Sequence, residues 1–272
     1  MSQTVQHFIC VTCGIEYPES AKPPEGCPVC QDDRQFIPPE GQQWTTLDEM
    51  RGKYHNVMEP EEPGLFSIHT EPAFAITQRA FLIATPDGNI LWDCLTMLDD
   101  ATISAVRERG GIQAIAISHP HYYSSMVEWS RAFDAPIFLH ENDWRWVMRP
   151  DPGIQFWRGD ARPFIGGTTL INTAGHFPGA QALHWPAGAE GRGAIFSGDQ
   201  PQVCYDRQWL SFMYSYPNWL PLGPTAVQRT LEVLRPFDFD RIYGAFQKRT
   251  IARDGKQVLE RSVERYLRAI TA

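Results

Sequence analysis

The sequence has no long apolar run and no cluster of charges of one sign. No stretch of its 272 residues reaches the roughly 18 consecutive apolar residues of a membrane-spanning helix, and residues 1–8 lack the basic flank and apolar core of a signal peptide. We therefore expect a cytoplasmic protein that does not enter membranes. The net charge of −8 is spread along the chain, which argues against nucleic acid or an anionic membrane surface as a partner, because both bind clustered Lys and Arg.

Internal repeats are absent and cysteine is scarce, but the placement of the cysteines is informative. Four of the six form two CxxC pairs, Cys10 with Cys13 and Cys27 with Cys30, and thirteen residues lie between the pairs. This spacing is similar to that of zinc ribbons and rubredoxin-like modules, in which two tight turns present four thiolates to one ion. We predict a structural Zn²⁺ site, with iron as the alternative ion because four thiolates accept both metals. Disulfides or free thiols are the alternatives to a metal.

A histidine pair follows an apolar strand that is predicted over residues 111–118. The chain continues as His119-Pro120-His121-Tyr122-Tyr123-Ser124. Two histidines spaced i, i+2 on a strand point the same way and can bind one cation. Pro120 ends the strand where the two imidazoles are needed. The segment therefore predicts half of a metal site.

This segment resembles the HxHxDH signature of the metallo-β-lactamase superfamily. Residues 175–179 (GHFPG) resemble the loop that carries the third histidine of that family, and residues 197–199 (SGD) resemble its bridging aspartate at a strand end. The resemblance implies that one Zn²⁺ or Fe²⁺ ion is surrounded by four residues, namely His119, His121, His176 and Asp199.

The second metal site of the family pattern is missing from this sequence. Its aspartate and histidine fall on Tyr123 and Ser124, and its late histidine falls within Tyr243–Phe246, where there is none. The resemblance therefore implies a divergent member of the superfamily with a single-ion site.

Strand and helix patterns divide the chain into three parts. Residues 1–40 form the cysteine module, residues 41–63 a linker with a short helix capped by Thr46, and residues 64–272 the large domain. The Pro- and Glu-rich interval 59–64 is predicted to be a surface loop. A capping box at Thr225 is predicted to begin a helix. Strands are predicted at 65–70, 74–85, 90–94, 136–139, 168–173, 181–185 and 193–197, and helices at 99–110, 126–133, 142–148 and near 258–270.

This order of strand pairs and interspersed helices fits an α/β (α+β) fold. More specifically, it fits an αββα sandwich with functional sites on loops at one edge of the sheets. The family resemblance covers roughly residues 60–272 and implies the same sandwich.

The expected chemistry centres on one ion. Such an ion would polarise a bound water and lower its pKa towards about 7 if it is zinc. Asp199 is either a ligand or a general base beside that water. Without a second ion, we expect Tyr122 or Tyr123 to donate a hydrogen bond to a developing oxyanion, with Glu128 as a more remote group for proton transfer. Asp93 resembles a family position that supports the metal ligands without binding the ion.

Aromatic residues are concentrated in residues 205–222, directly after the Asp199 strand. They are interpreted as a pocket wall over the metal that selects an apolar or aromatic substrate. A homo-oligomer contact and simple core packing are the alternatives. The residues concerned are Trp209, Phe212, Tyr214, Tyr216 and Trp219.

Three functions are compatible with these features. The first is a single-metal hydrolase of a small substrate with an ester, thioester, lactone or amide-like bond. The second is a mononuclear Fe(II) oxidoreductase similar to persulfide dioxygenases, with His119, His176 and Asp199 as ligands and the rubredoxin-like module as electron donor. The third is a non-catalytic scaffold with a degenerate site. We favour the hydrolase, because the residues of the first metal site are present.

Overall fold

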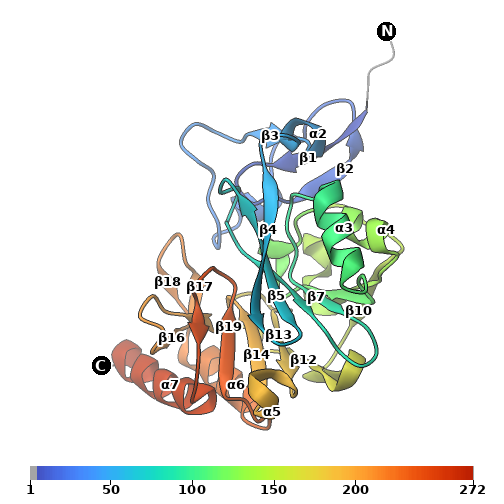
Figure 1. Ribbon diagram of the computed structural model, residues 1–272. Helices are drawn as coiled ribbons and strands as arrows, with labels where there is room; N and C mark the ends of the chain where they lie inside the picture. Colours follow the sequence, from blue (N-terminus) through green and yellow to red (C-terminus); the bar gives the residue numbers. More distant parts are fainter. Residues whose placement is uncertain (1–4, 272) are drawn as a thin grey trace.

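The structure is a computed structural model that describes residues 5–271. The first four residues of the expected cysteine module and the last residue of the expected large domain lie outside the described residues. Two β-sheets pack face to face, helices cover their outer faces, and the N-terminal module lies at one end of the sandwich, at the top of Figure 1.

The first sheet has seven strands. In spatial order they are β10 (Ile154–Trp157), β9 (Ile137–His140), β8 (Ala114–Ala116), β7 (Ile90–Trp92), β6 (Ala80–Ile83), β5 (Leu65–Glu71) and β4 (His55–Glu62). Strands β4 to β7 are antiparallel neighbours, whereas β7 to β10 run parallel. Parallel neighbours need a crossover connection, and α3 (Asp100–Glu108) and α4 (Met126–Phe133) provide two of them. The predicted strand 74–85 is shorter than expected, because residues 74–79 form a loop before β6.

The second sheet has six strands. In spatial order they are β11 (Ala161–Pro163), β12 (Thr169–Asn172), β13 (Gln181–Trp185), β14 (Ala194–Gly198), β19 (Arg241–Gly244) and β20 (Thr250–Ile251). Only β14 and β19 are parallel within it. Their crossover passes through α6 (Pro224–Leu234), and α7 (Gly255–Thr271) closes the chain.

Helix positions follow from the apolar stripes of the sequence. Val227 and Leu231 of α6 and Val258 of α7 are buried in one cluster on the outer face of the second sheet. Asp99 is the N-cap of α3, and its side chain accepts from Thr102 N at 2.7 Å. The predicted helix start at Thr225 was wrong, because α6 already begins at Pro224, which is favoured at the first helical position. No helix of the described part combines the length and the apolar character needed to cross a membrane.

The core between the sheets is built from inward-facing apolar side chains of both. Phe81 of the first sheet meets Phe196 of the second with ring centroids 4.9 Å apart, and Phe196 stacks on Tyr243 at 5.0 Å. Offset and edge-on aromatic pairs of this kind contribute about 0.5–1.5 kcal/mol beyond burial. The predicted αββα sandwich is confirmed.

The N-terminal module and the expected linker are more regular than predicted. A small sheet, in the order β2 (Glu16–Ser20), β1 (Gln6–Cys10) and β3 (Trp44–Thr45), carries the short helix α1 (Pro28–Gln31) beside it. Strand β3 lies beyond residue 40, so the module takes in part of the expected linker. The short helix of the linker is α2 (Leu47–Met50), and Thr46 caps it as predicted.

The predicted surface loop at 59–64 was wrong for most of its length. Residues 55–62 form β4 and pair with β5. This strand is at the edge of the seven-stranded sheet, where Pro60 removes no ladder bond from a second neighbour.

The remaining elements are short. The predicted helix 142–148 is the 3₁₀-helix η2 (Glu141–Trp146). The others are η1 (Pro120–Tyr122), η3 (Ile165–Gly167), α5 (Gly188–Gly191), and two hairpins made of β15 (Gln202–Val203) with β16 (Leu210–Ser211) and β17 (Met213–Ser215) with β18 (Leu220–Pro221).

Candidate metal centre

The two histidines of the signature lie beyond β8 rather than on it. Strand β8 ends at Ala116, His119 is still extended with φ −167° and ψ 170°, and residues 120–122 form a 3₁₀ turn. The predicted i, i+2 arrangement on one strand face is therefore wrong, because the chain bends at Pro120. The bend nevertheless brings both rings to one point, with centroids 5.1 Å apart.

Four buried side chains converge at this point, as predicted. The ligand atoms of His119, His121, His176 and Asp199 all lie within 4.8 Å of one another. Nε2 of His176 is 3.3 Å from Nδ1 of His121, and Nε2 of His119 is 3.6 Å from Oδ2 of Asp199. His119 and His121 follow β8, His176 lies between β12 and β13, and Asp199 follows β14, so both sheets contribute.

The histidine rings are held with free nitrogen atoms towards the centre. Nδ1 of His176 donates to the main-chain oxygen of Tyr214 at 2.8 Å, and Oγ of Ser118 lies 2.9 Å from Nδ1 of His119. Nε2 of His119 and of His121 are buried without a hydrogen-bond partner among the described residues. Burial lowers the pKa of His176 to about 4 and that of His119 well below its ordinary range. Neutral rings with unpartnered buried nitrogen atoms fit a metal ion.

Asp199 is fixed by two donors on one carboxylate oxygen. The hydroxyl of Tyr122 donates to Oδ1 at 2.8 Å, and Nε2 of Gln202 donates to the same atom at 2.9 Å. Oδ2 is thereby turned towards His119. Burial raises the pKa of Asp199 to about 6. Tyr122 is fully buried and its hydroxyl is engaged by Asp199, so the geometry favours a role in positioning Asp199 over the expected role as donor to an oxyanion.

Asp93 lies one layer behind the ligands, where the resemblance places a supporting residue. Its Oδ1 accepts from the main-chain N–H of Ser118 at 2.7 Å, and its Oδ2 is buried without a partner in the described part of the chain. Burial raises the pKa of Asp93 to about 7. Through Ser118, this carboxylate fixes the backbone that leads into His119.

The residues in place of the second metal site face the N-terminal module. The main-chain oxygen of Ser124 accepts from Glu16 N at 3.1 Å, and Tyr123 lines a small gap together with Glu16. Glu128 forms an ion pair with Arg149 at 2.7 Å, and Arg149 also pairs with Glu16. Tyr123 and Glu128 therefore face the N-terminal module and do not line the cavity beside the metal ligands, because the module packs against them.

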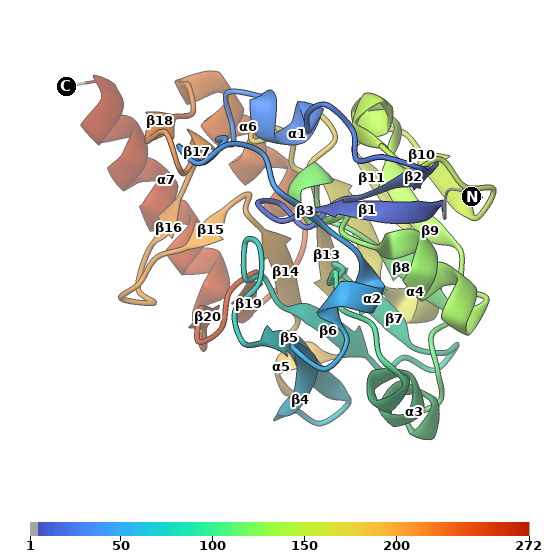
Figure 2. The same cartoon turned by 90° about the horizontal axis from the view of Figure 1, so that it is seen from above.

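A cavity of about 290 Å³ lies beside the four ligands. His121, His176 and Asp199 line it, and the N-terminal module contributes four further lining residues, which are Thr12, Arg34, Gln35 and Phe36. Seen from above in Figure 2, the segment after α1 runs beside β17 and β18. Asn218 fixes it there, because its amide donates to the main-chain oxygens of Asp33 at 2.9 Å and Gln35 at 3.0 Å.

Arg34 is the functional candidate that sequence analysis missed. Its side chain is buried and pairs with both carboxylate oxygens of Asp32, at 2.5 and 2.9 Å. Nη1 donates to the main-chain oxygen of His176 at 3.2 Å, and the guanidinium lies 4.1 Å from the centre of the Phe177 ring. No spacing rule connects Arg34 with the histidines, and only the folded contact reveals it.

Only part of the predicted aromatic pocket wall surrounds the metal. Tyr216 lines the cavity, and its hydroxyl donates to the main-chain oxygen of Asp199 at 3.1 Å. Tyr214 lies under the Arg34 guanidinium at 5.0 Å. Phe212 is instead buried against α7, Trp209 lies against Arg265, and Trp219 is 84% exposed. Of the five predicted residues, only Tyr216 lines the cavity, because the two hairpins place the others in the core, under Arg34 or at the surface.

The four cysteines form a second buried cluster. Their ligand atoms lie within 4.8 Å of one another, with Cys10 Sγ 3.5 Å from Cys30 Sγ and Cys13 Sγ 3.6 Å from Cys27 Sγ. Four thiolates about 2.3 Å from one ion are about 3.8 Å apart, whereas a disulfide needs about 2.05 Å. Hydrogen bonds from Cys13 and the other two thiols hold the pKa of Cys10 well below its ordinary range. The donor set therefore fits a metal ion and not a disulfide.

Comparisons with known proteins agree with this geometry. The family model described as the metallo-beta-lactamase superfamily matches residues 76–201. The uncharacterized protein YmaE of Bacillus subtilis (strain 168) is 47% identical over 268 residues, which cover 98% of this chain and 97% of that protein. A Cronobacter sakazakii metallo-β-lactamase with a HARLDQ motif has a TM-score of 0.51 at 18% identity, over 78% of this chain and 94% of that chain. The structure of VMB-1 has a TM-score of 0.60 at 10% identity, and the match covers 80% of this chain and 99% of that chain. The chain belongs to the metallo-β-lactamase superfamily.

Proposed function

We propose that this chain is a hydrolase that uses one divalent metal ion, Zn²⁺ or Fe²⁺, held by His119, His121, His176 and Asp199. The main support for this proposal is that four buried ligand atoms converge beside a cavity, and that two of them are imidazole nitrogen atoms without a hydrogen-bond partner among the described residues. The substrate is a small molecule with an ester, thioester, lactone or amide-like bond. Hydrolysis joins a water oxygen to the acyl carbon, breaks the bond to the leaving group, and passes a proton to that group.

The chain's own residues prepare the site in several ways. When bound, the ion supplies Lewis acidity and makes hydroxide available near neutral pH. Neutral imidazoles preserve the charge of the ion, and Tyr122 and Gln202 hold Asp199 in one orientation. Arg34 lines the cavity wall with its charge balanced by Asp32, and its hydrogen bond to the main-chain oxygen of His176 holds the loop that carries this ligand.

We also propose that the four-cysteine cluster holds Zn²⁺ as a structural ion. All four donors are sulfur and all are buried, which suits a closed tetrahedral site. Because thiolates must stay reduced, this proposal favours a reducing compartment such as the cytoplasm. The exposed Trp219 and Leu220 of the β17–β18 hairpin support a contact between copies of the chain as a further proposal.

The test combines metal identification with hydrolysis. Anomalous scattering at the Zn and Fe edges, recorded from crystals of the native protein, assigns the ion at each cluster. The same preparation is assayed with chromogenic esters, thioesters, lactones and a β-lactam, before and after chelation. We expect metal at the histidine cluster and hydrolysis that is lost on chelation and restored by the metal.

Matched variants make this test specific. His121→Ala removes a ligand, whereas His140→Ala removes a buried histidine that contacts the main-chain oxygen of Gly159 at 3.1 Å and lies outside the cluster. Activity should disappear only in the first. An empty histidine cluster under every metal supply would refute the hydrolase proposal and favour a scaffold. Iron at both clusters with oxygen consumption would favour the Fe(II) oxidoreductase.

A further inference from the structure

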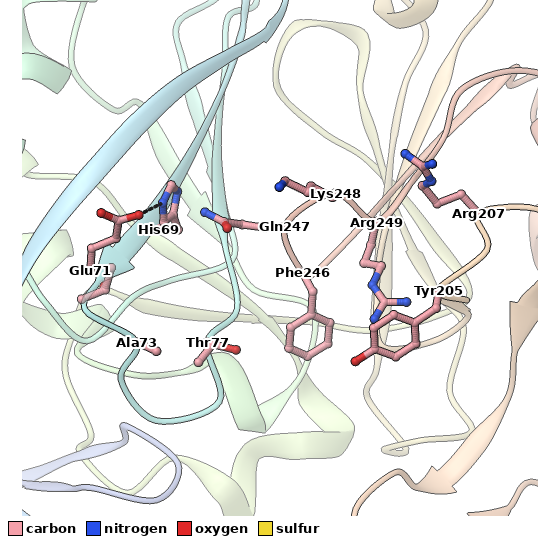
Figure 3. Close-up of a pocket in the computed structure, with 11 residues that line it drawn as sticks. His69, Glu71, Ala73, Thr77, Tyr205, Arg207, Phe246, Gln247, Lys248 and Arg249 are labelled. Carbon is pink, nitrogen blue, oxygen red and sulfur yellow. Dashed lines mark hydrogen bonds and ion pairs between the residues drawn. The ribbon is translucent and has the colours of Figure 1, made fainter.

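A second, larger cavity lies next to the metal cavity. It has a volume of about 650 Å³, and Figure 3 shows the side chains that line it. Phe246 belongs to the walls of both cavities, and the loop 73–77 contributes side chains to both. The two cavities are therefore neighbours that share Phe246 and this loop as a boundary. We call the larger one the outer pocket.

The outer pocket is lined by three cations although the chain as a whole carries a net charge of −8. They are Arg207, Lys248 and Arg249. Within residues 5–271, none of the three forms a salt bridge with a carboxylate. The one carboxylate in the lining is Glu71, on the opposite wall in Figure 3, and it lies 3.3 Å from Nε2 of His69. Three unpaired cations in one concavity attract an anion, since like charges on low-dielectric walls focus the field.

Two of the three cations, Lys248 and Arg249, lie on a turn whose backbone is held in place. The turn after β19 is fixed by the buried Arg79, whose guanidinium donates to the main-chain oxygens of Gly244 at 3.1 Å and Arg249 at 3.2 Å. The guanidinium of Arg249 in turn lies 3.1 Å from the centre of the Tyr205 ring. A site that is ordered before its ligand arrives loses less entropy on binding.

This turn includes the stretch in which the two-metal pattern has its late histidine. Here the stretch ends in Phe246, and Lys248 and Arg249 follow after Gln247. The segment therefore contributes no metal ligand. It contributes an apolar boundary to the metal cavity and two positive charges beyond that boundary.

We propose that the outer pocket binds an anionic group of the substrate, a carboxylate or a phosphate, while the bond to be cleaved lies in the metal cavity on the other side of Phe246. This inference rests on the proposed hydrolase function and narrows its substrates to anionic esters, thioesters or amides. The global negative charge of the chain does not oppose it, because the field that a ligand meets is that of the nearest unpaired charges.

The test uses three thioesters with the same acetyl group. Their leaving groups are 2-mercaptoethanol, 3-mercaptopropionate and 2-mercaptoethyl phosphate, which end in a hydroxyl, a carboxylate and a phosphate. The double variant Arg207→Gln/Lys248→Gln removes two charges from the outer pocket. The matched control, Lys53→Gln/Arg235→Gln, removes one exposed lysine and one exposed arginine that line neither cavity.

We expect the wild type to prefer one or both anionic thioesters over the neutral one. In the double variant the ratio of kcat/KM for anionic to neutral substrate should fall about tenfold, because hydrogen bonds to charged groups are lost. The control should keep the wild-type ratio. The carboxylate and phosphate arms identify the preferred anion.

A binding measurement separates this inference from the hydrolase proposal. Succinate and inorganic phosphate are titrated into the wild type and the double variant, and amide chemical shifts around Lys248 are followed by NMR. Binding to the wild type alone, with no hydrolysis of these thioesters or of the esters, lactones and β-lactam assayed above, would preserve the anion site and overturn the hydrolase. Equal hydrolysis of all three thioesters, with neither anion bound, would overturn the anion site and preserve the hydrolase.

Discussion

The two candidate metal clusters of this chain differ in what surrounds their ligand atoms. In the four-cysteine cluster all four donors are buried thiols, which is the number of ligands that a closed tetrahedral shell needs. In the histidine cluster three imidazoles and one carboxylate lie beside a cavity of about 290 Å³. A complete thiolate shell suits an ion that stabilises a fold, whereas ligands beside a cavity suit an ion that meets a substrate.

The module of the four-cysteine cluster also helps to build the histidine cluster. Thr12 lies between two of the cysteines and Arg34 follows the last of them by four residues, and both line the cavity of the histidine cluster. Arg34 binds the main-chain oxygen of His176. The cysteine cluster therefore helps to shape the histidine cluster, and the histidine cluster depends on it. Variants can test that dependence.

The largest effect is expected from Cys13→Ser/Cys27→Ser. This variant should lose the ion of the cysteine cluster and with it much of the order of the module, because an ion in such a small unit supplies folding free energy. The Tm should fall by more than about 10 °C. Release of Arg34 should also weaken metal binding at the histidine cluster. Calorimetry and metal analysis measure the two effects.

The control for this variant is Cys204→Ser, which removes a half-buried thiol outside the cluster. Unchanged metal affinity at the histidine cluster in Cys13→Ser/Cys27→Ser would show that the two clusters are independent.

The reverse experiment, His176→Ala, should act on one cluster alone. The metal affinity of the histidine cluster should fall more than about a hundredfold, since even the loss of a residue that supports a ligand costs 10- to 100-fold. The ion of the cysteine cluster should stay, because no described contact of the cysteines depends on the His176 ring. Metal analysis after dialysis reports both occupancies, and the loss of both ions would contradict the proposed direction of dependence.

A smaller effect is expected from Arg34→Lys. Lysine keeps the charge but cannot pair in bidentate fashion with Asp32 while it stacks on Phe177. The metal affinity of the histidine cluster should fall about tenfold. Chelator competition measures it, and Arg145→Lys is the control, because Arg145 lies over Trp146 and does not line the metal cavity. Equal metal affinities of the two variants would show that Arg34 does not support the histidine cluster.

The difference between what the sequence predicts and what it hides follows the range of the contacts. His119, His176 and Asp199 were predictable, because the short motifs that contain them resemble those of the metallo-β-lactamase superfamily in order and spacing. The bounds of α4 were predictable too, because a local apolar stripe specifies them. Arg34 was not, since its role depends on a contact between residues 142 positions apart in the chain. The surface loop predicted around Pro60 was wrong for a related reason. Only the folded sheet shows that Pro60 lies in an edge strand, where proline is tolerated.

The smallest effect is expected from Tyr122→Phe, which tests how the ligands of the histidine cluster are held. It removes one of the two donors to Oδ1 of Asp199 and leaves Gln202 in place. The free energy of unfolding should fall by about 1 kcal/mol, and metal affinity by less than about tenfold. Tyr216→Phe is the matched control, because that hydroxyl donates to the main-chain oxygen of Asp199 and not to its carboxylate. A larger loss of metal affinity in Tyr122→Phe than in Tyr216→Phe would show that the orientation of the carboxylate, and not the packing of the tyrosines, prepares the site; equal losses would contradict it.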